Sequence, residues 1–168
     1  MRVFQSQSVP AGGLIKFTNN DGDTHLSFQH YTENFVQAIF DSIEAKGSTL
    51  VIGGDGRYFS PETVQTILKI GSANGVAKFI VGKDSILSTP AASNIIRKYK
   101  AYGGILLTAS HNPGGPNNDF GIKYNVSNGG PAPENVTNII YEKTKTIQKY
   151  KVIDAPPVSD RQSMTTLQ

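Results

Sequence analysis

The run GGILLTASHNPGGP fills residues 103–116 and leads from a buried strand into a rigid loop. Residues 105–107 are apolar and suited to a strand, whereas those after Ala109 are small, polar or ring-locked, so the chain must leave the sheet there. Ser110 and His111 therefore lie at the carboxyl end of a strand. Because open α/β sheets bind their ligands in the crevice at such ends, this loop is the candidate site.

The segments on either side of this loop predict an α/β domain. Strands and helices alternate at a spacing that implies right-handed crossovers and a largely parallel sheet, and the last strand comes back beside its predecessor. We therefore expect a mixed, mostly parallel sheet sandwiched between helices. The expected elements are a helix from Tyr31, with Thr32 as N-cap, to Ile43; strands over 49–52 and 76–81; helices opening at Ser60-Pro61 and Thr89-Pro90; strands over 105–107 and 120–125; and a last helix around 136–143.

Composition narrows the functional classes. The 168 residues suffice for one domain with a sizeable core, and they include no cysteine, which removes disulfides, thiolate zinc sites and a cysteine nucleophile. The apolar runs are far shorter than the roughly 20 residues of a membrane helix, and the N-terminus lacks a signal-peptide pattern. The net charge of +3 comes from scattered basic residues, so nucleic acid is not an expected partner. We expect a soluble, cytoplasmic protein without a membrane or nucleic-acid partner.

The chemistry of the loop favours phosphate. A serine hydroxyl needs help from a base or a metal, and His111 is only a sequence neighbour of Ser110, so a dyad between them does not follow. Gly114-Gly115 leaves backbone N–H groups open to anionic oxygens, and Lys123 on the returning strand adds a cation near the loop. Peptide or ester hydrolysis is less favoured, because the Gly-x-Ser-x-Gly elbow is missing.

Two other polar turns can each be interpreted either as a functional site or as a structural feature. Asp55 and Arg57 follow the strand over 49–52, and Arg57 either clamps a ligand phosphate with its guanidinium or pairs with Asp55 to brace the turn. Asp21-Gly22-Asp23, with His25 nearby, suggests a metal loop. A solvated loop tip is the better interpretation, because further oxygen ligands and a closing Glu are missing.

Two motifs in this region resemble a known family. TASHNPGGP at 108–116, followed by DFGIK at 119–123, is similar to the active-serine signature of the α-D-phosphohexomutases, in particular the phosphoglucomutases of eukaryotic type. The likeness extends from about residue 31 to residue 150. It takes in GGDGR at 53–57, ILSTP at 86–90 and SNGGPAP at 127–133. The fold it implies is that of the first domain of this family.

The resemblance also implies a reaction. Ser110 would carry a phosphoryl group and exchange it with a sugar, interconverting glucose 1-phosphate and glucose 6-phosphate through a glucose bisphosphate. His111 and Lys123 would handle protons and stabilise charge, and Mg²⁺ would bind an oxygen of the phosphate on Ser110. Substrate contacts are implied for Arg57, Thr108 and Asn112.

The chain departs from the family in extent. Members have four domains and this chain resembles only the first, so the aspartate ligands of the magnesium loop, the sugar-reading loop and the phosphate clamp have no counterpart, and the missing domains would be its partners. We expect a divergent N-terminal segment over 1–29, inserted from about residue 6, a phosphohexomutase domain over 30–150 and a linker or tail over 151–168. The hypothesis is a truncated or spliced product or an inaccurate gene model, with little activity by itself.

Two alternatives of other classes stay open. One is a non-catalytic relative of the aciculin type, which binds cytoskeletal or adhesion-associated partners. The other is an orphan domain that binds a phosphosugar or a partner protein without turnover.

Overall fold

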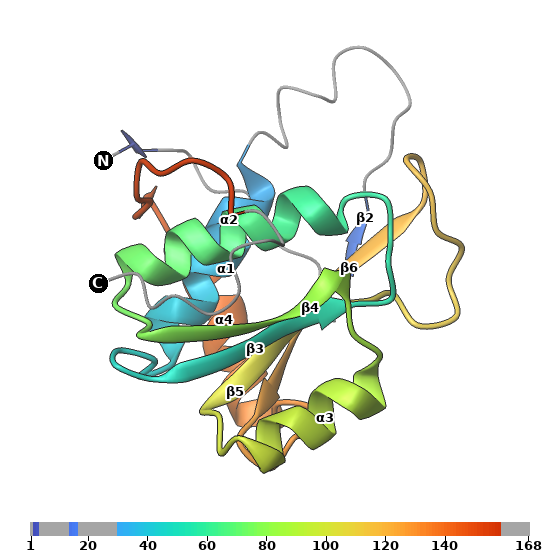
Figure 1. The fold of residues 1–168 in the computed structure, drawn as a ribbon. Coiled ribbons are helices and arrows are strands. Elements are labelled where there is room, and N and C mark those ends of the chain that lie inside the picture. The colour runs from blue at the N-terminus through green and yellow to red at the C-terminus, as the bar shows by residue number, and fades with distance from the viewer. Residues whose placement is uncertain (1, 4–13, 17–29, 159–168) are drawn as a thin grey trace.

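The computed structural model describes residues 2–3, 14–16 and 30–158, and these form a three-layered α/β domain (Figure 1). Its elements are β1 (Arg2–Val3), β2 (Leu14–Lys16), α1 (Tyr31–Ser42), β3 (Thr49–Gly54), α2 (Ser60–Ala73), β4 (Lys78–Ile86), α3 (Thr89–Lys98), β5 (Gly103–Leu107), β6 (Asp119–Val126), α4 (Glu134–Thr146) and β7 (Lys149–Tyr150). No helix within the described ranges is long and apolar enough to cross a membrane.

The main sheet is mixed and mostly parallel, as predicted. Its strand order is β2-β6-β5-β3-β4, with β3 parallel to both β4 and β5. β6 returns antiparallel to β5, and β2 pairs antiparallel with β6. A separate two-stranded pair joins β1 to β7. The parallel strands β3 and β5 therefore present their carboxyl ends at the same edge, where the serine loop begins.

Apolar residues on both faces of the sheet explain the layers. Leu50 and Ile52 of β3 join a core shared with α1, α2 and α4, whereas Val51 between them joins a second core with Ala92 and Ile96 of α3. Successive residues of a strand point to opposite faces, so a strand buried on both sides is apolar throughout. Figure 1 shows α3 alone on one face of the sheet. The predicted sandwich of helices around a sheet is confirmed.

A close approach of β3 and β5 positions the site. A Cβ at Gly54 would lie 2.1 Å from the backbone oxygen of Leu107, so only glycine fits there. The next residue, Asp55, donates its N–H to that same oxygen at 3.1 Å. This contact brings the turn after β3 against Thr108, the first residue after β5.

The helix caps differ from those that the sequence predicts. The N-cap of α1 is His30, in the left-handed region at φ 70°, and not Thr32. The N-cap of α2 is Phe59, so the hydroxyl of Ser60 lies inside the helix and is buried without a hydrogen bond. α3 is capped by Ser88, whose oxygen accepts from the N–H of Ala91. The sequence signals at Thr32, Ser60 and Thr89 thus lie one or two residues after the observed caps. A serine or threonine in the first helical turn gives the same sequence signal as one at the cap.

β4 continues past the predicted end at Val81. It pairs Val81 with Ile52 of β3, breaks register, and pairs again where Ile86 meets Gly54. Within the break, Asp84 and Ser85 both adopt positive φ, at 52° and 65°. Two consecutive left-handed residues are typical of a tight turn that usually carries Asn-Gly, so Asp-Ser gave no clear signal.

The described part of the predicted linker or tail, residues 151–158, lies along the domain. These residues form no helix or strand, and Lys151 and Ile153 donate backbone N–H groups to Gln37 of α1 and Lys69 of α2. Val158 exchanges two hydrogen bonds with the side chain of Gln65, both at 2.9 Å. The described part of this segment therefore packs on α1 and α2.

Candidate active site

Ser110 lies three residues beyond the end of β5, where the sequence places it. Its side chain is exposed and its backbone is left-handed, at φ 54°. For a residue with a Cβ this conformation costs about 1–2 kcal/mol, so surrounding contacts must hold it. The loop thus presents the serine hydroxyl outward on a constrained backbone.

Lys123 provides the direct partner of the serine hydroxyl. Its ammonium group donates to the Ser110 Oγ at 2.9 Å. The antiparallel register of β5 and β6 sets Lys123 opposite Leu106, close to the point where the loop departs. An ammonium at this place can stabilise negative charge on a group transferred to or from the oxygen, and it can give that oxygen a proton.

Asp55 and Thr108 fix the backbone of the serine. The Thr108 hydroxyl donates to Asp55 Oδ2 at 2.7 Å and accepts the N–H of Ser110 at 3.1 Å. Thr108 is buried, so this relay is shielded from water. The chain of bonds ties the turn after β3 to the reactive residue after β5.

Arg57 lies beneath the loop and is 9% exposed. The sequence left two roles open for it, and the geometry favours bracing, because its donors are directed at the protein. They contact Asp55 Oδ2 through Nε (3.1 Å), the carbonyls of Pro113 (3.0 Å) and Asp119 (2.8 Å) through Nη1, and the carbonyls of Ser110 (3.3 Å) and Asn112 (2.8 Å) through Nη2.

His111 and Asn112 lie on the exposed side of the loop. The side chain of Asn112 donates to Asp119 at the start of β6, which closes the loop at its far end. In the part of the chain that the structure describes, the His111 ring makes no hydrogen bond, to Ser110 or to any other residue. The ring is therefore available to a ligand in front of Ser110.

The structure brings the predicted residues into one network, with His111 beside it. It also adds two carboxylates that the sequence reasoning left out of the site. Asp55 joins Thr108 and Arg57, and Asp119 joins Asn112. Both belong to the quoted motifs GGDGR and DFGIK, so motif membership was the signal that could have found them.

The described residues do not make a complete metal site. No group of three or more histidine, aspartate or glutamate side chains that could hold an ion occurs among them. Asp55 and Asp119 are already engaged with Thr108, Arg57 and Asn112. The suggested loop at Asp21 and Asp23 lies outside the described residues.

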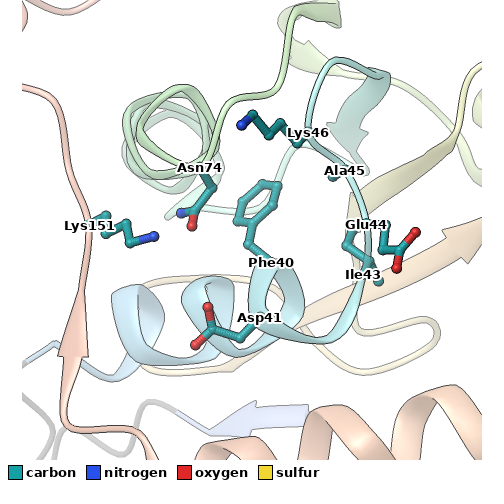
Figure 2. A pocket seen from close by; sticks show the side chains of 8 residues that line it. All are labelled: Phe40, Asp41, Ile43, Glu44, Ala45, Lys46, Asn74 and Lys151. Carbon is teal, nitrogen blue, oxygen red and sulfur yellow. The ribbon is translucent and has the colours of Figure 1, made fainter.

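A separate pocket of about 520 Å³ opens at the other end of the sheet (Figure 2). Figure 2 shows Lys46 and Lys151 pointing toward Asn74 from opposite sides, with Asp41 below. The pocket adjoins the amino end of β3, whereas Ser110 follows the carboxyl end of the parallel β5. It is therefore not part of the serine site. Its lining residues are Phe40, Asp41, Ile43, Glu44, Ala45, Lys46, Asn74 and Lys151.

Comparisons with known proteins agree on one family. The sequence model "Phosphoglucomutase/phosphomannomutase, alpha/beta/alpha domain I" matches residues 11–151. The chain is 63% identical over 159 residues to the phosphoglucomutase of Schizosaccharomyces pombe, covering 94% of this chain and 28% of that protein. It is 50% identical over 154 residues to human phosphoglucomutase-1, covering 90% and 27%.

A solved structure shares the fold. The open form of the exocytosis-sensitive phosphoprotein pp63/parafusin, a phosphoglucomutase from Paramecium, superposes with a TM-score of 0.77 at 40% identity, covering 92% of this chain and 29% of that one. The chain thus spans about a quarter of the length of the curated relatives that it matches. The chain belongs to the phosphoglucomutase/phosphomannomutase family, in which it corresponds to the α/β/α domain I.

Proposed function

We propose that Ser110 is the phosphoryl carrier of a phosphoglucomutase, acting together with the further domains that its relatives contain. The observation that carries this proposal is the 2.9 Å bond from Lys123 to the serine hydroxyl, on a loop held by buried contacts. A hydroxyl that must release and regain a phosphoryl group needs a proton source beside it. The substrates proposed are glucose 1-phosphate and glucose 6-phosphate.

The reaction would proceed by two transfers. A sugar hydroxyl attacks the phosphorus on Ser110, and the bond from phosphorus to Oγ breaks. The hydroxyl proton passes to His111, and Lys123 stabilises the departing Oγ and protonates it. The glucose bisphosphate formed then turns around, and Oγ attacks its other phosphate in the reverse sequence. The sugar leaves with the phosphate at its new position.

The three residues proposed for substrate contacts differ in their exposure to solvent. They are Thr108, Asn112 and Arg57. Asn112 is exposed beside Ser110 and is the residue of the three that can reach a bound phosphosugar. Thr108 and Arg57 are buried and act on the loop. Magnesium and a cytoplasmic location remain proposals that rest on the resemblance to the family. The phosphate on Ser110 would give the ion one oxygen, and the described residues do not complete its coordination.

The comparisons bear on one of the two alternative classes, the non-catalytic relative of the aciculin type. The relatives reported above are phosphoglucomutases, and nothing among them favours an adhesion-associated protein of the aciculin type. We also propose that the domain covers residues 30–150, with a divergent segment over 1–29 and a linker over 151–168.

A chimera tests the proposal. The matching region of the Schizosaccharomyces pombe phosphoglucomutase is replaced by this chain, and interconversion of the glucose phosphates is followed in a coupled assay. We expect turnover from the chimera, little from the 168-residue chain alone, and a loss of at least about 10³-fold in Ser110→Ala, since the nucleophile is removed.

The control is Ser127→Ala, an exposed serine in the turn after β6, which should leave turnover unchanged. Intact-mass measurement of the chimera should find one phosphate that Ser110→Ala lacks. Ordinary turnover by the Ser110→Ala chimera would refute the carrier role.

A further inference from the structure

All the N–H donors of the Arg57 guanidinium are bonded to protein atoms. In this respect Arg57 differs from an arginine that binds a ligand. A guanidinium has five N–H donors, and the five hydrogen bonds of Arg57 end on one carboxylate and four backbone carbonyls. With 9% of the residue exposed, a phosphate can reach it only by breaking these bonds. Its influence on a ligand must therefore pass through the loop.

The bonds of Arg57 set the direction of the loop peptides. In a trans peptide the C=O and the following N–H point in opposite directions, and the described residues include no cis peptide. The carbonyls of Ser110 and Pro113 point inward to the guanidinium, so the N–H groups of His111 and Gly114 point away from it. The carbonyl of Asn112 precedes a proline, which has no N–H to turn outward.

The two outward N–H groups have no protein acceptor. In the described part of the chain, neither the N–H of His111 nor that of Gly114 makes a hydrogen bond within the protein. Ser110, whose hydroxyl accepts from the Lys123 ammonium at 2.9 Å, directly precedes His111 in the loop. Backbone N–H groups that converge beside a cation form a concave site for an anion.

We propose that Arg57 is a positioning residue that turns the amides of His111 and Gly114 toward the oxygens of the phosphoryl group, without touching that group itself. The proposal rests on the proposed function for the identity of the anion. It differs from a general stabilising role, because it predicts that phosphate affinity depends on the planar, five-donor geometry of Arg57 rather than on its charge.

The matched change is Arg57→Lys, which keeps the charge but offers three donors in place of five. The ¹⁵N-labelled full chain is titrated with inorganic phosphate, and amide shifts are followed by NMR. In the wild type we expect the amides of His111 and Gly114 to move together toward one saturation value. Arg57→Lys should bind phosphate about tenfold or more weakly, because peptide groups released from the guanidinium no longer hold their orientation.

The control is Arg97→Lys, because Arg97 also donates to a backbone carbonyl, that of Asn128, which lies at the opposite end of the β5–β6 pair from the serine loop. This variant should bind phosphate as the wild type does. Thermal unfolding of all three proteins separates a loss of affinity from a loss of fold. Wild-type phosphate affinity in a folded Arg57→Lys overturns the proposal.

If Arg57→Lys does not fold, the titration of the wild-type chain with phosphate still tests the proposal. Amide signals of His111 and Gly114 that do not shift on addition of phosphate would overturn it without any variant. The proposed function has its own readout, the phosphate on Ser110 measured by mass in the chimera. A phosphorylated serine with silent loop amides would refute the role of Arg57 and leave the carrier role standing.

Discussion

At the scale of single residues, the contact between Lys123 and Ser110 is the feature with the most direct chemical consequence. Lys123→Met removes the ammonium and keeps an unbranched side chain that is one heavy atom shorter. In the chimera we expect phosphoryl transfer from Ser110 to glucose 1-phosphate to slow by about 10²–10⁴-fold, because the departing oxygen loses its proton donor. Rapid-quench, single-turnover measurement of the phosphate left on Ser110 gives this rate directly.

Lys145→Met is the matched control for this prediction. Lys145 is an exposed lysine of α4 that pairs with Glu142, and its loss should leave the transfer rate unchanged. If Lys123→Met transfers as fast as Lys145→Met, the ammonium has no part in the chemistry. A fall in substrate affinity with an unchanged transfer rate would point instead to a role in binding only.

The sequence could predict this pair but not the bonds beneath it. Ser110 and Lys123 lie on adjoining segments of a returning strand pair, so their proximity follows from the pattern of the chain. Arg57, by contrast, bonds to backbone carbonyls, which every residue type possesses. No side-chain pattern marks such an acceptor, and the bracing role therefore needed the structure.

At the scale of elements, the end of α3 shows a residue that is unsuited to its place. Lys100 has φ 49°, and two hydrogen bonds close the helix around it: Ala101 N–H to Ile96 O at 2.9 Å and Lys100 N–H to Arg97 O at 3.2 Å. This is the Schellman arrangement, with Ala101 and Ile96 in apolar contact, in which glycine is the preferred residue at the left-handed position. A lysine there is conformationally strained.

Lys100→Gly should therefore stabilise the chain by about 1 kcal/mol, since glycine adopts positive φ without a steric penalty. Lys98→Gly is the matched control. It makes the same chemical change two residues earlier, at the last helical position of α3, where glycine costs up to about 1 kcal/mol. Urea unfolding should move the two midpoints in opposite directions. A destabilised Lys100→Gly would show that the side chain of Lys100 contributes more than its backbone strain costs.

The same element shows where sequence reasoning reaches its limit. The apolar spacing and the Thr89-Pro90 signal predicted that α3 exists, and this was correct. The cap at Ser88 and the left-handed Lys100 depend on the conformation of single residues at its ends. Those conformations are fixed by packing onto β5 and by local hydrogen bonds, which the sequence pattern does not encode.

At the scale of the whole molecule, the layers around the sheet could be predicted from the sequence. The packing of residues 151–158 against α1 and α2 could not. β3 and β5 are apolar on both faces, so helices must cover both. The segment over 151–158 has no periodicity, and its bonds to Gln37, Gln65 and Lys69 come from side chains and carbonyls along two helices. Such contacts depend on the completed fold, and a polar, proline-containing stretch therefore resembled a free tail.

Burial in the larger core makes this fold sensitive to alkaline pH. Tyr124 of β6 is 7% exposed, and burial, assisted by the neighbouring Tyr102, raises the pKa of Tyr124 well above its ordinary value. Burial likewise raises the pKa of Tyr31 to about 12. In the unfolded chain a tyrosine ionises near pH 10. Above that pH the unfolded state loses protons that the folded state keeps, so the free energy of unfolding falls.

The stability due to these neutral tyrosines is thus fully present below pH 10 and declines as the pH rises toward their folded pKa values. Each such tyrosine steepens the decline by up to about 1.4 kcal/mol per pH unit. Tyr124→Phe removes one ionisable group and should flatten the fall in urea-unfolding free energy between pH 9.5 and 11.5. The control Tyr99→Phe changes a tyrosine that is 56% exposed, and its unfolding free energy should fall with pH as steeply as that of the wild type. An equal slope in Tyr124→Phe and the wild type would mean that Tyr124 ionises alike in the folded and unfolded chain, so that its burial exerts no control over alkaline stability.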